Sequence, residues 1–372
     1  MSSTSSPQPK LRKIRQIHRL KRKCQPTPAN SFPVSALITF MVCLTCAAIA
    51  ALLIGAYSHS PSPISPHSQY QSRLLASQQL HTRLHVTNGK VLPAHTSSVT
   101  TISFSPSGSQ MLTTGSDGSS KIWDRQGNLI RQTKPNPSII WSSSFSPDGQ
   151  SFVTGSQDGK VRLWDLRGNL IREFMAHPDW VNTVSFSNNG RQLLTASSDG
   201  TAKLWNLKGQ QISKFQGHQG KVWVAAFSPR GNLIATAGND QIIRLWDLQG
   251  KLVNQLKGHQ GSIRALNFSP DGKHLVSAGE DRTARIWSIN GKQLYQLKGH
   301  DGTLRQVIFS PNGSLIATSS EDQTIGLWNL QGKRLEKLQG HQDWVIDLGF
   351  SPDGKVLASS SADSTVRFWQ ID

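Results

Sequence analysis

Histidine, a hydroxyl residue and aspartate recur together along the chain, and these are the side chains of a nucleophilic triad. The histidines are His95, His177, His218, His259, His300 and His341, with Asn136 at the corresponding position of the second copy. The hydroxyl residues are Thr113, Thr154, Thr195, Thr236, Ser277, Thr318 and Ser359. The aspartates are Asp117, Asp158, Asp199, Asp240, Asp281, Asp322 and Asp363. One such set could transfer an acyl group, but seven copies of one catalytic site are far less expected than seven copies of one structural device.

A tryptophan recurs with the same period and indicates what the repeated structural element is. It stands at Trp123, Trp164, Trp205, Trp246, Trp287, Trp328 and Trp369, one every 41 residues. The indole N–H can donate to the hydroxyl, the hydroxyl to the imidazole and the imidazole to the carboxylate, so that each buried polar group satisfies another. We therefore predict a repeated structural network. Because Asn136 cannot fully replace an imidazole, the second copy should be the loosest.

The remaining residues supply no second candidate for catalysis. Only His274 lies within the repeats and outside the histidine series, and the three cysteines, Cys24, Cys43 and Cys46, all precede the repeats. No spacing matches a metal site, a phosphate-binding loop or a dinucleotide fingerprint. We therefore predict no catalytic site, no metal site and no cofactor.

The segments between these markers have the pattern of short strands. In the first copy, Val99 to Phe104 alternates apolar and polar residues and runs into a turn that ends at Gly108. Further strands are expected at Met111 to Thr114, at Lys121 to Trp123 and near Leu129 to Thr133. Four strands per copy predict one antiparallel sheet for each 41-residue unit.

These motifs resemble those of WD-repeat β-propellers, and the Trp-Asp pair itself survives at Trp123-Asp124, Trp164-Asp165 and Trp246-Asp247. The resemblance covers roughly Val86 to Asp372 and implies an all-β, seven-bladed propeller over residues 84–372. The last tryptophan stands three residues before Asp372, so the seventh blade lacks its fourth strand at the carboxyl end. In this family a segment upstream of the first repeat closes the ring, and Leu84 to Leu92 is the candidate. The resemblance also implies a protein-interaction platform, without naming a partner.

Function in a repeat scaffold is sought where the copies differ. Seven such side chains stand three or five residues after the histidine position: Trp141, Trp180, Lys221, Trp223, Arg264, Arg305 and Trp344. In WD-repeat propellers this region borders one mouth of the central channel. Aromatic and guanidinium groups there would form a rim for a peptide or an acidic partner, because such residues dominate interface energetics. The alternative is that the tryptophans only fill gaps between blades.

Residues 1–83 differ in composition from the repeats, since all 22 acidic residues follow them. Residues 1–33 carry a run of lysines and arginines and are interpreted as a basic cytoplasmic tail. The segment from Val34 to Tyr57 contains no charged residue and, as a helix, is long enough to cross a membrane. Residues 58–83, rich in serine and proline, are interpreted as a flexible linker. The positive-inside rule then places the propeller on the exoplasmic side, which is the periplasm in a bacterium.

A cleavable signal peptide is the alternative interpretation of this segment, with a cleavage site such as Ala56-Tyr57-Ser58. The apolar stretch is longer than the apolar core of a usual signal peptide, which favours an uncleaved single-pass anchor. Much of the net charge of +18 comes from residues 1–83, so the repeats are only mildly basic. That charge does not indicate dedicated nucleic-acid binding.

The sequence therefore predicts a non-catalytic, membrane-tethered scaffold or adaptor that binds other proteins or peptides through one face of a propeller. Two alternatives from other classes remain. One is a propeller enzyme or carbohydrate-binding module that uses the central channel. The other is a sensor that signals through the basic tail, although a tail this short leaves no room for a folded output domain.

Overall fold

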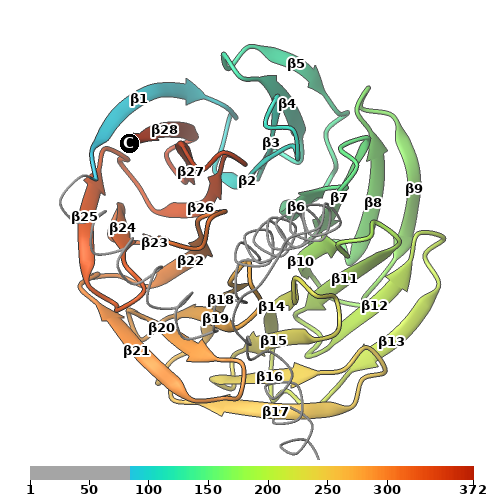
Figure 1. Cartoon of the computed structure of the whole chain (residues 1–372). Helices are drawn as coiled ribbons and strands as arrows, with labels where there is room; N and C mark the ends of the chain where they lie inside the picture. Colours follow the sequence, from blue (N-terminus) through green and yellow to red (C-terminus); the bar gives the residue numbers. More distant parts are fainter. Residues whose placement is uncertain (1–83) are drawn as a thin grey trace, which may run out of the picture. The chain divides into compact units, whose positions relative to one another are not determined.

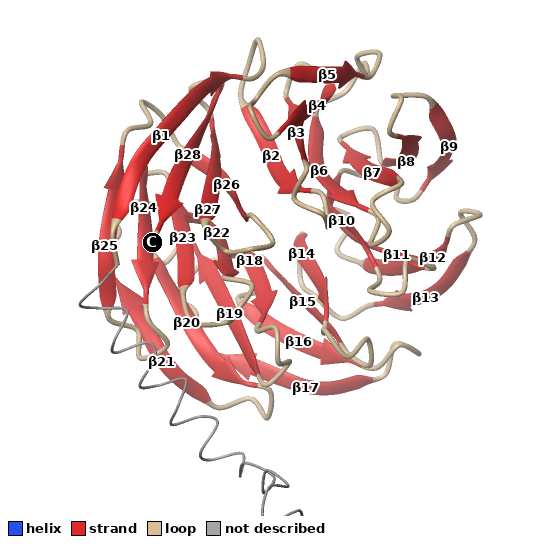
Figure 2. Ribbon diagram, turned by 45° about the horizontal axis from the view of Figure 1, so that its top comes forward, coloured by secondary structure: helices blue, strands red, loops and turns tan. Residues whose placement is uncertain are grey.

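The computed structural model describes residues 84–372, which form seven four-stranded antiparallel sheets arranged around a ring (Figure 1). The tail, membrane segment and linker expected at residues 1–33, 34–57 and 58–83 lie outside the described residues. Between residues 84 and 372 there is no helix long and apolar enough to span a membrane. The sheets fan around the ring as blades, numbered here 1 to 7 along the chain (Figure 2).

Blades 1 to 3 each take four consecutive strands, given from the innermost outward. Blade 1 comprises β2 (Val99–Phe104), β3 (Gln110–Gly115), β4 (Ser120–Asp124) and β5 (Leu129–Gln132). Blade 2 comprises β6 (Ile140–Phe145), β7 (Ser151–Ser156), β8 (Lys160–Asp165) and β9 (Leu170–Met175). Blade 3 comprises β10 (Val181–Phe186), β11 (Gln192–Ser197), β12 (Ala202–Asn206) and β13 (Gln211–Phe215).

Blades 4 to 6 follow the same order, whereas blade 7 draws its outer strand from the beginning of the described chain. Blade 4 comprises β14 (Val222–Phe227), β15 (Ile234–Gly238), β16 (Ile242–Trp246) and β17 (Leu252–Lys257). Blade 5 comprises β18 (Ile263–Phe268), β19 (His274–Gly279), β20 (Thr283–Ser288) and β21 (Gln293–Lys298). Blade 6 comprises β22 (Leu304–Phe309), β23 (Ile316–Ser320), β24 (Thr324–Trp328) and β25 (Arg334–Gln339). Blade 7 comprises β26 (Val345–Phe350), β27 (Val356–Ser361), β28 (Thr365–Ile371) and β1 (Val86–Pro93).

Blade 7 closes the ring, as the sequence led us to expect. Strand β1 pairs antiparallel with β28, with Val86 opposite Ile371 and Pro93 opposite Thr365. On the inner side, β26 and β2 contact one another, and the Asp347 carboxylate accepts the Ile102 N–H at 2.9 Å. The pairing of β1 with β28 therefore gives blade 7 four strands, like the other blades.

Apolar side chains fill the space between neighbouring blades. The Trp287 indole of blade 5, for example, packs with Ile243 and Leu245 of blade 4 in one buried cluster. Similar clusters occur around the ring, so each blade buries one face against its neighbour. Stacking of this kind is why a single repeat would not be stable alone.

The strand directions define two faces. We call the end of the sheets that carries the network histidines and aspartates the histidine face. Because β1 runs toward this end before reaching Pro93, Leu84 lies at the opposite face. There the backbone of His85 exchanges hydrogen bonds with Asp372, at 3.0 and 3.3 Å. The point where residue 84 joins the propeller and the network residues therefore lie at opposite ends of the sheets.

Candidate functional site

Each of six blades contains a continuous chain of hydrogen bonds through the repeated residues. In blade 5, Trp287 Nε1 donates to Ser277 Oγ at 2.8 Å, and His259 Nε2 lies 2.7 Å from the same oxygen. The other ring nitrogen, His259 Nδ1, lies 2.9 Å from the Asp281 carboxylate. Blades 1, 3, 4, 6 and 7 repeat these contacts at 2.7 to 3.1 Å.

Burial and hydrogen bonding shift the pKa values of several groups in these networks. Desolvation lowers the pKa of His259 below its ordinary value, although the hydrogen bond to Asp281 opposes it. A neutral imidazole suits the geometry, because Nδ1–H donates to the carboxylate while Nε2 accepts the hydroxyl proton. Burial raises the pKa of Asp117, but hydrogen bonds from Ser119 and His95 outweigh it and bring the pKa down to about 2. His95, His177 and His259, whose pKa values burial lowers, are thus neutral imidazoles held against a carboxylate.

The position of the hydroxyl residues argues against a role in nucleophilic catalysis. All seven are 0% exposed, and each accepts an indole N–H. A buried hydroxyl whose lone pair is engaged in this way has no path to a substrate. Nor is any group of three or more His, Cys, Asp or Glu side chains between residues 84 and 372 placed to hold a metal ion.

Blade 2 departs from the pattern more than the sequence suggested. Trp164 still donates to Thr154 at 2.9 Å, but the Asn136 side chain donates to Ser156 Oγ at 2.9 Å. The Asp158 carboxylate instead binds the Arg162 guanidinium at 2.6 Å. The Asn136 side chain thus bonds neither Thr154 nor Asp158, in keeping with the prediction that it cannot fully replace an imidazole.

The seven residues that break the repeat lie together at the histidine face. Trp141, Trp223, Arg264 and Arg305 are each the second residue of an innermost strand. Trp180, Lys221 and Trp344 immediately precede innermost strands. Since the innermost strands contact one another around the ring, all seven lie at the start of these strands on the histidine face. We call this set the aromatic arc.

Ring stacking and cation–π contacts join the arc from blade 2 to blade 5. The Trp141 and Trp180 rings stack with their centroids 5.7 Å apart and their planes 20° apart. Lys221 Nζ lies 4.9 Å from the Trp180 centroid and 5.4 Å from that of Trp223. The Arg264 guanidinium lies over the Trp223 ring, with Cζ 3.9 Å from the ring centroid. A cation over an aromatic face is attracted by the ring quadrupole, so these contacts hold the side chains in place.

The arc continues on blades 6 and 7. Strands β18 and β22, which carry Arg264 and Arg305, contact one another. Arg305 Cζ lies 5.0 Å from the Trp344 centroid. Burial lowers the pKa of Arg305, and the charge of Arg264 adds to this effect. Trp344 is 44% exposed, which makes it the one tryptophan among the large exposed apolar side chains of residues 84–372.

The structure also shows partners of the arc that the sequence reasoning missed. Arg264 Nε donates to Glu280 at 3.0 Å, and Arg305 Nε lies 3.0 Å from Glu321. Trp223 Nε1 donates to Asn239 at 2.5 Å in the same way. In each case the partner immediately precedes the network aspartate, at the same step along the chain. The constant spacing between each arc residue and its partner was visible in the sequence. Only the fold shows that the two positions, at the start of the innermost strand and in the aspartate turn, lie next to each other.

Comparison with known proteins agrees with this geometry. A family model described as WD domain, G-beta repeat matches seven successive segments, at residues 87–124, 127–165, 168–206, 209–247, 250–288, 291–329 and 332–370. Together these segments cover well over half of the 372 residues. No curated protein was found that matches the chain.

Proposed function

Because the chain belongs to the WD-repeat family, whose propellers are typically protein-interaction scaffolds, we propose that it is a non-catalytic scaffold that binds protein or peptide segments at the aromatic arc. One observation carries this proposal: the residues that break the sevenfold repeat form a connected set on one face. Tryptophan and arginine dominate the energetics of protein interfaces, particularly when neighbouring contacts hold them rigid. Side chains needed only to fill gaps would not have to include charged groups.

The charges of the arc favour a partner that is not strongly acidic. Glu280 and Glu321 compensate the two arginines, so the guanidinium groups present flat, largely neutralised surfaces. Lys221 is shared between two tryptophan faces and forms no ion pair with another residue of 84–372. The exposed ring of Trp344 offers apolar area beside Arg305. These features suit a segment that stacks an aromatic or proline ring on Trp344 and places polar groups over the arginines.

We further propose that the scaffold is tethered to a membrane through Val34 to Tyr57, with its amino terminus in the cytoplasm. The support is the absence of charge throughout that stretch and the basic run before it. Protease added to spheroplasts should digest the propeller; full protection would overturn this orientation.

The scaffold proposal is tested with a photo-crosslinking residue at position 344 of the full chain. Crosslinked partners are identified, and the affinity of the purified partner is then measured for wild type and for Trp344→Ala. We expect a loss of about tenfold or more, as for an interface hot spot. Ile171→Ala is the matched control, because Ile171 is 53% exposed but lies on β9, an outermost strand. Equal affinities of the two variants would remove the arc as the binding site.

Trp344→Ala is a cleaner test than charge reversal at the arginines. Glutamate at position 264 would face Glu280, which the native guanidinium binds, and the repulsion would destabilise the blade itself. A loss of binding would then report unfolding as much as recognition. Trp344 is 44% exposed and its ring lies against Arg305, so its removal should leave the fold intact.

A further inference from the structure

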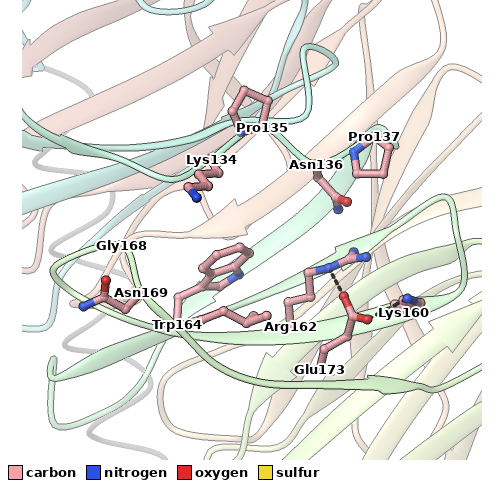
Figure 3. Close-up of a pocket in the computed structure, with 11 residues that line it drawn as sticks. Lys134, Pro135, Asn136, Pro137, Lys160, Arg162, Trp164, Gly168, Asn169 and Glu173 are labelled. Atoms are coloured by element: carbon pink, nitrogen blue, oxygen red, sulfur yellow. Dashed lines mark hydrogen bonds and ion pairs between the residues drawn. The ribbon is translucent and has the colours of Figure 1, made fainter.

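A pocket of about 600 Å³ opens beside blade 2, away from the aromatic arc. The β5–β6 connection forms one wall, with Lys134, Pro135 and Pro137 (Figure 3). Strands β8 and β9 form the other, where Trp164 and Arg162 face the connection. A volume of this size is typical of sites for small ligands.

The two adjacent blades, 1 and 3, differ from blade 2 at this connection. In blades 1 and 3 the residue before the histidine is Ala94 or Ala176, which are 1% and 3% exposed. Lys121 and Lys203 donate to the carbonyls of these alanines at 2.8 Å and so tie the connection to the sheet.

In blade 2, Pro135 stands in place of the alanine and is exposed. Arg162, at the position of those lysines, turns instead to Asp158 at 2.6 Å and to Glu173 at 2.5 Å. The flanking prolines fix the backbone of the connection on either side of Asn136. The space is therefore left by a change of sequence at several positions rather than by one missing side chain.

The lining combines apolar walls with uncompensated positive charge. Trp164, Pro135, Pro137 and Leu170 contribute apolar surface. The charge of Arg162 is balanced by Asp158 and Glu173, and Lys160 also binds Glu173, at 2.6 Å. Lys134 is exposed and forms no ion pair with another residue of 84–372, so its ammonium is available to a ligand.

We propose that this pocket binds a small planar organic anion, with the ring against Trp164 and the prolines and the carboxylate on Lys134. Such a ligand matches the apolar walls and supplies the one charge that the lining lacks. The residues that line the pocket include none of the seven residues of the arc.

The test uses benzoate as the probe, with benzamide and benzylammonium as its neutral and cationic counterparts. Binding to the full chain is followed by saturation-transfer NMR, with a protein-free sample of the same detergent as the blank. Benzoate should bind with a dissociation constant of about 1 mM, the scale for a ligand of this size. Benzamide should bind more weakly and benzylammonium weakest. No signal from benzoate at tenfold higher concentration would overturn the proposal.

Two variants locate the site. Lys134→Ala should weaken benzoate binding about tenfold, the loss expected for one charge-assisted hydrogen bond. Lys298→Ala is its matched control, because Lys298 holds the same repeat position before a complete network at His300. The triple variant Pro135→Ala, Asn136→His and Arg162→Lys copies the residues of blade 3 and should abolish binding at an unchanged unfolding midpoint. Equal benzoate binding by the two single lysine variants, or retained binding by a folded triple variant, would refute the assignment.

Discussion

Replacing His259 by alanine in blade 5 should cost roughly three times as much stability as replacing Asn136 in blade 2. The imidazole of His259 makes a charge-assisted hydrogen bond to Asp281 at 2.9 Å, worth about 1.5 to 3 kcal/mol. Its loss also leaves the hydroxyl of Ser277, which is 0% exposed, without its acceptor, at a cost of about 1 to 3 kcal/mol. Asp281 keeps bonds from Gln260 and Thr283, which limits the total to about 3 to 4 kcal/mol.

The matched change in blade 2 removes much less. Asn136→Ala deletes one neutral hydrogen bond, from the carboxamide to Ser156 at 2.9 Å, worth about 1 kcal/mol. The measurement is guanidinium unfolding of the full chain, followed by tryptophan fluorescence, with free energies compared at equal denaturant slopes. Equal losses for the two variants would refute the reasoning, because they would show that the complete network contributes no more than the incomplete one.

Two further predictions follow from burial and charge. The thermal midpoint should fall as the pH drops below about 6.5 and again below about 4. His95 and Asp117 both have lowered pKa values in the fold, so acid protonates these groups in the unfolded chain first. Asp347, whose pKa burial raises, acts in the opposite direction. A midpoint that stays level from pH 8 to pH 3 would contradict this. Leu92→Ala on the closing strand should cost about 3 kcal/mol of unfolding free energy in chemical denaturation, because Leu92 is 6% exposed. Val91→Ala, at a residue that is 41% exposed, should cost under 1 kcal/mol. Similar losses for the two variants would mean that β1 does not pack as described.

The seven-bladed fold was predictable because the same 41-residue pattern occurs in seven copies. The strand expected at Val99 to Phe104 has those bounds in the structure, and the neighbouring strands differ by a residue or two. The closing strand could also be placed near Leu84 to Leu92, since the last blade would otherwise lack a partner for β28. A pattern with a long fixed period constrains each copy by all the others.

The left-handed backbone conformation in the turn after the network aspartate could not be predicted from the sequence for every blade. In the turn after the network aspartate, blades 1 to 3 have glycine, with φ of 75° at Gly118. Blades 4 to 7 adopt the same left-handed conformation with other residues, including Gln241 at 66° and Arg282 at 60°. Side chains disfavour this region, so sequence alone would place different turns there. The strand pairing on either side and the aspartate hydrogen bonds impose the turn regardless of residue type.

The side chains that break the repeat were identifiable from the sequence, but their contacts were not. Reading Arg264 and Arg305 as free cations suggested an acidic partner, whereas the fold brings Glu280 and Glu321 to them from the aspartate turns. The sequence likewise indicated that Asn136 cannot fully replace a histidine, but not that its carboxamide would bind Ser156 while Arg162 binds Asp158. A repeat pattern shows where copies differ but not which differences compensate one another, because compensation joins residues of separate strands. The arc and the blade 2 pocket therefore differ in charge: the two arginines of the arc are paired with glutamates, whereas Lys134 of the pocket forms no ion pair with another residue of 84–372 and lies beside an apolar wall.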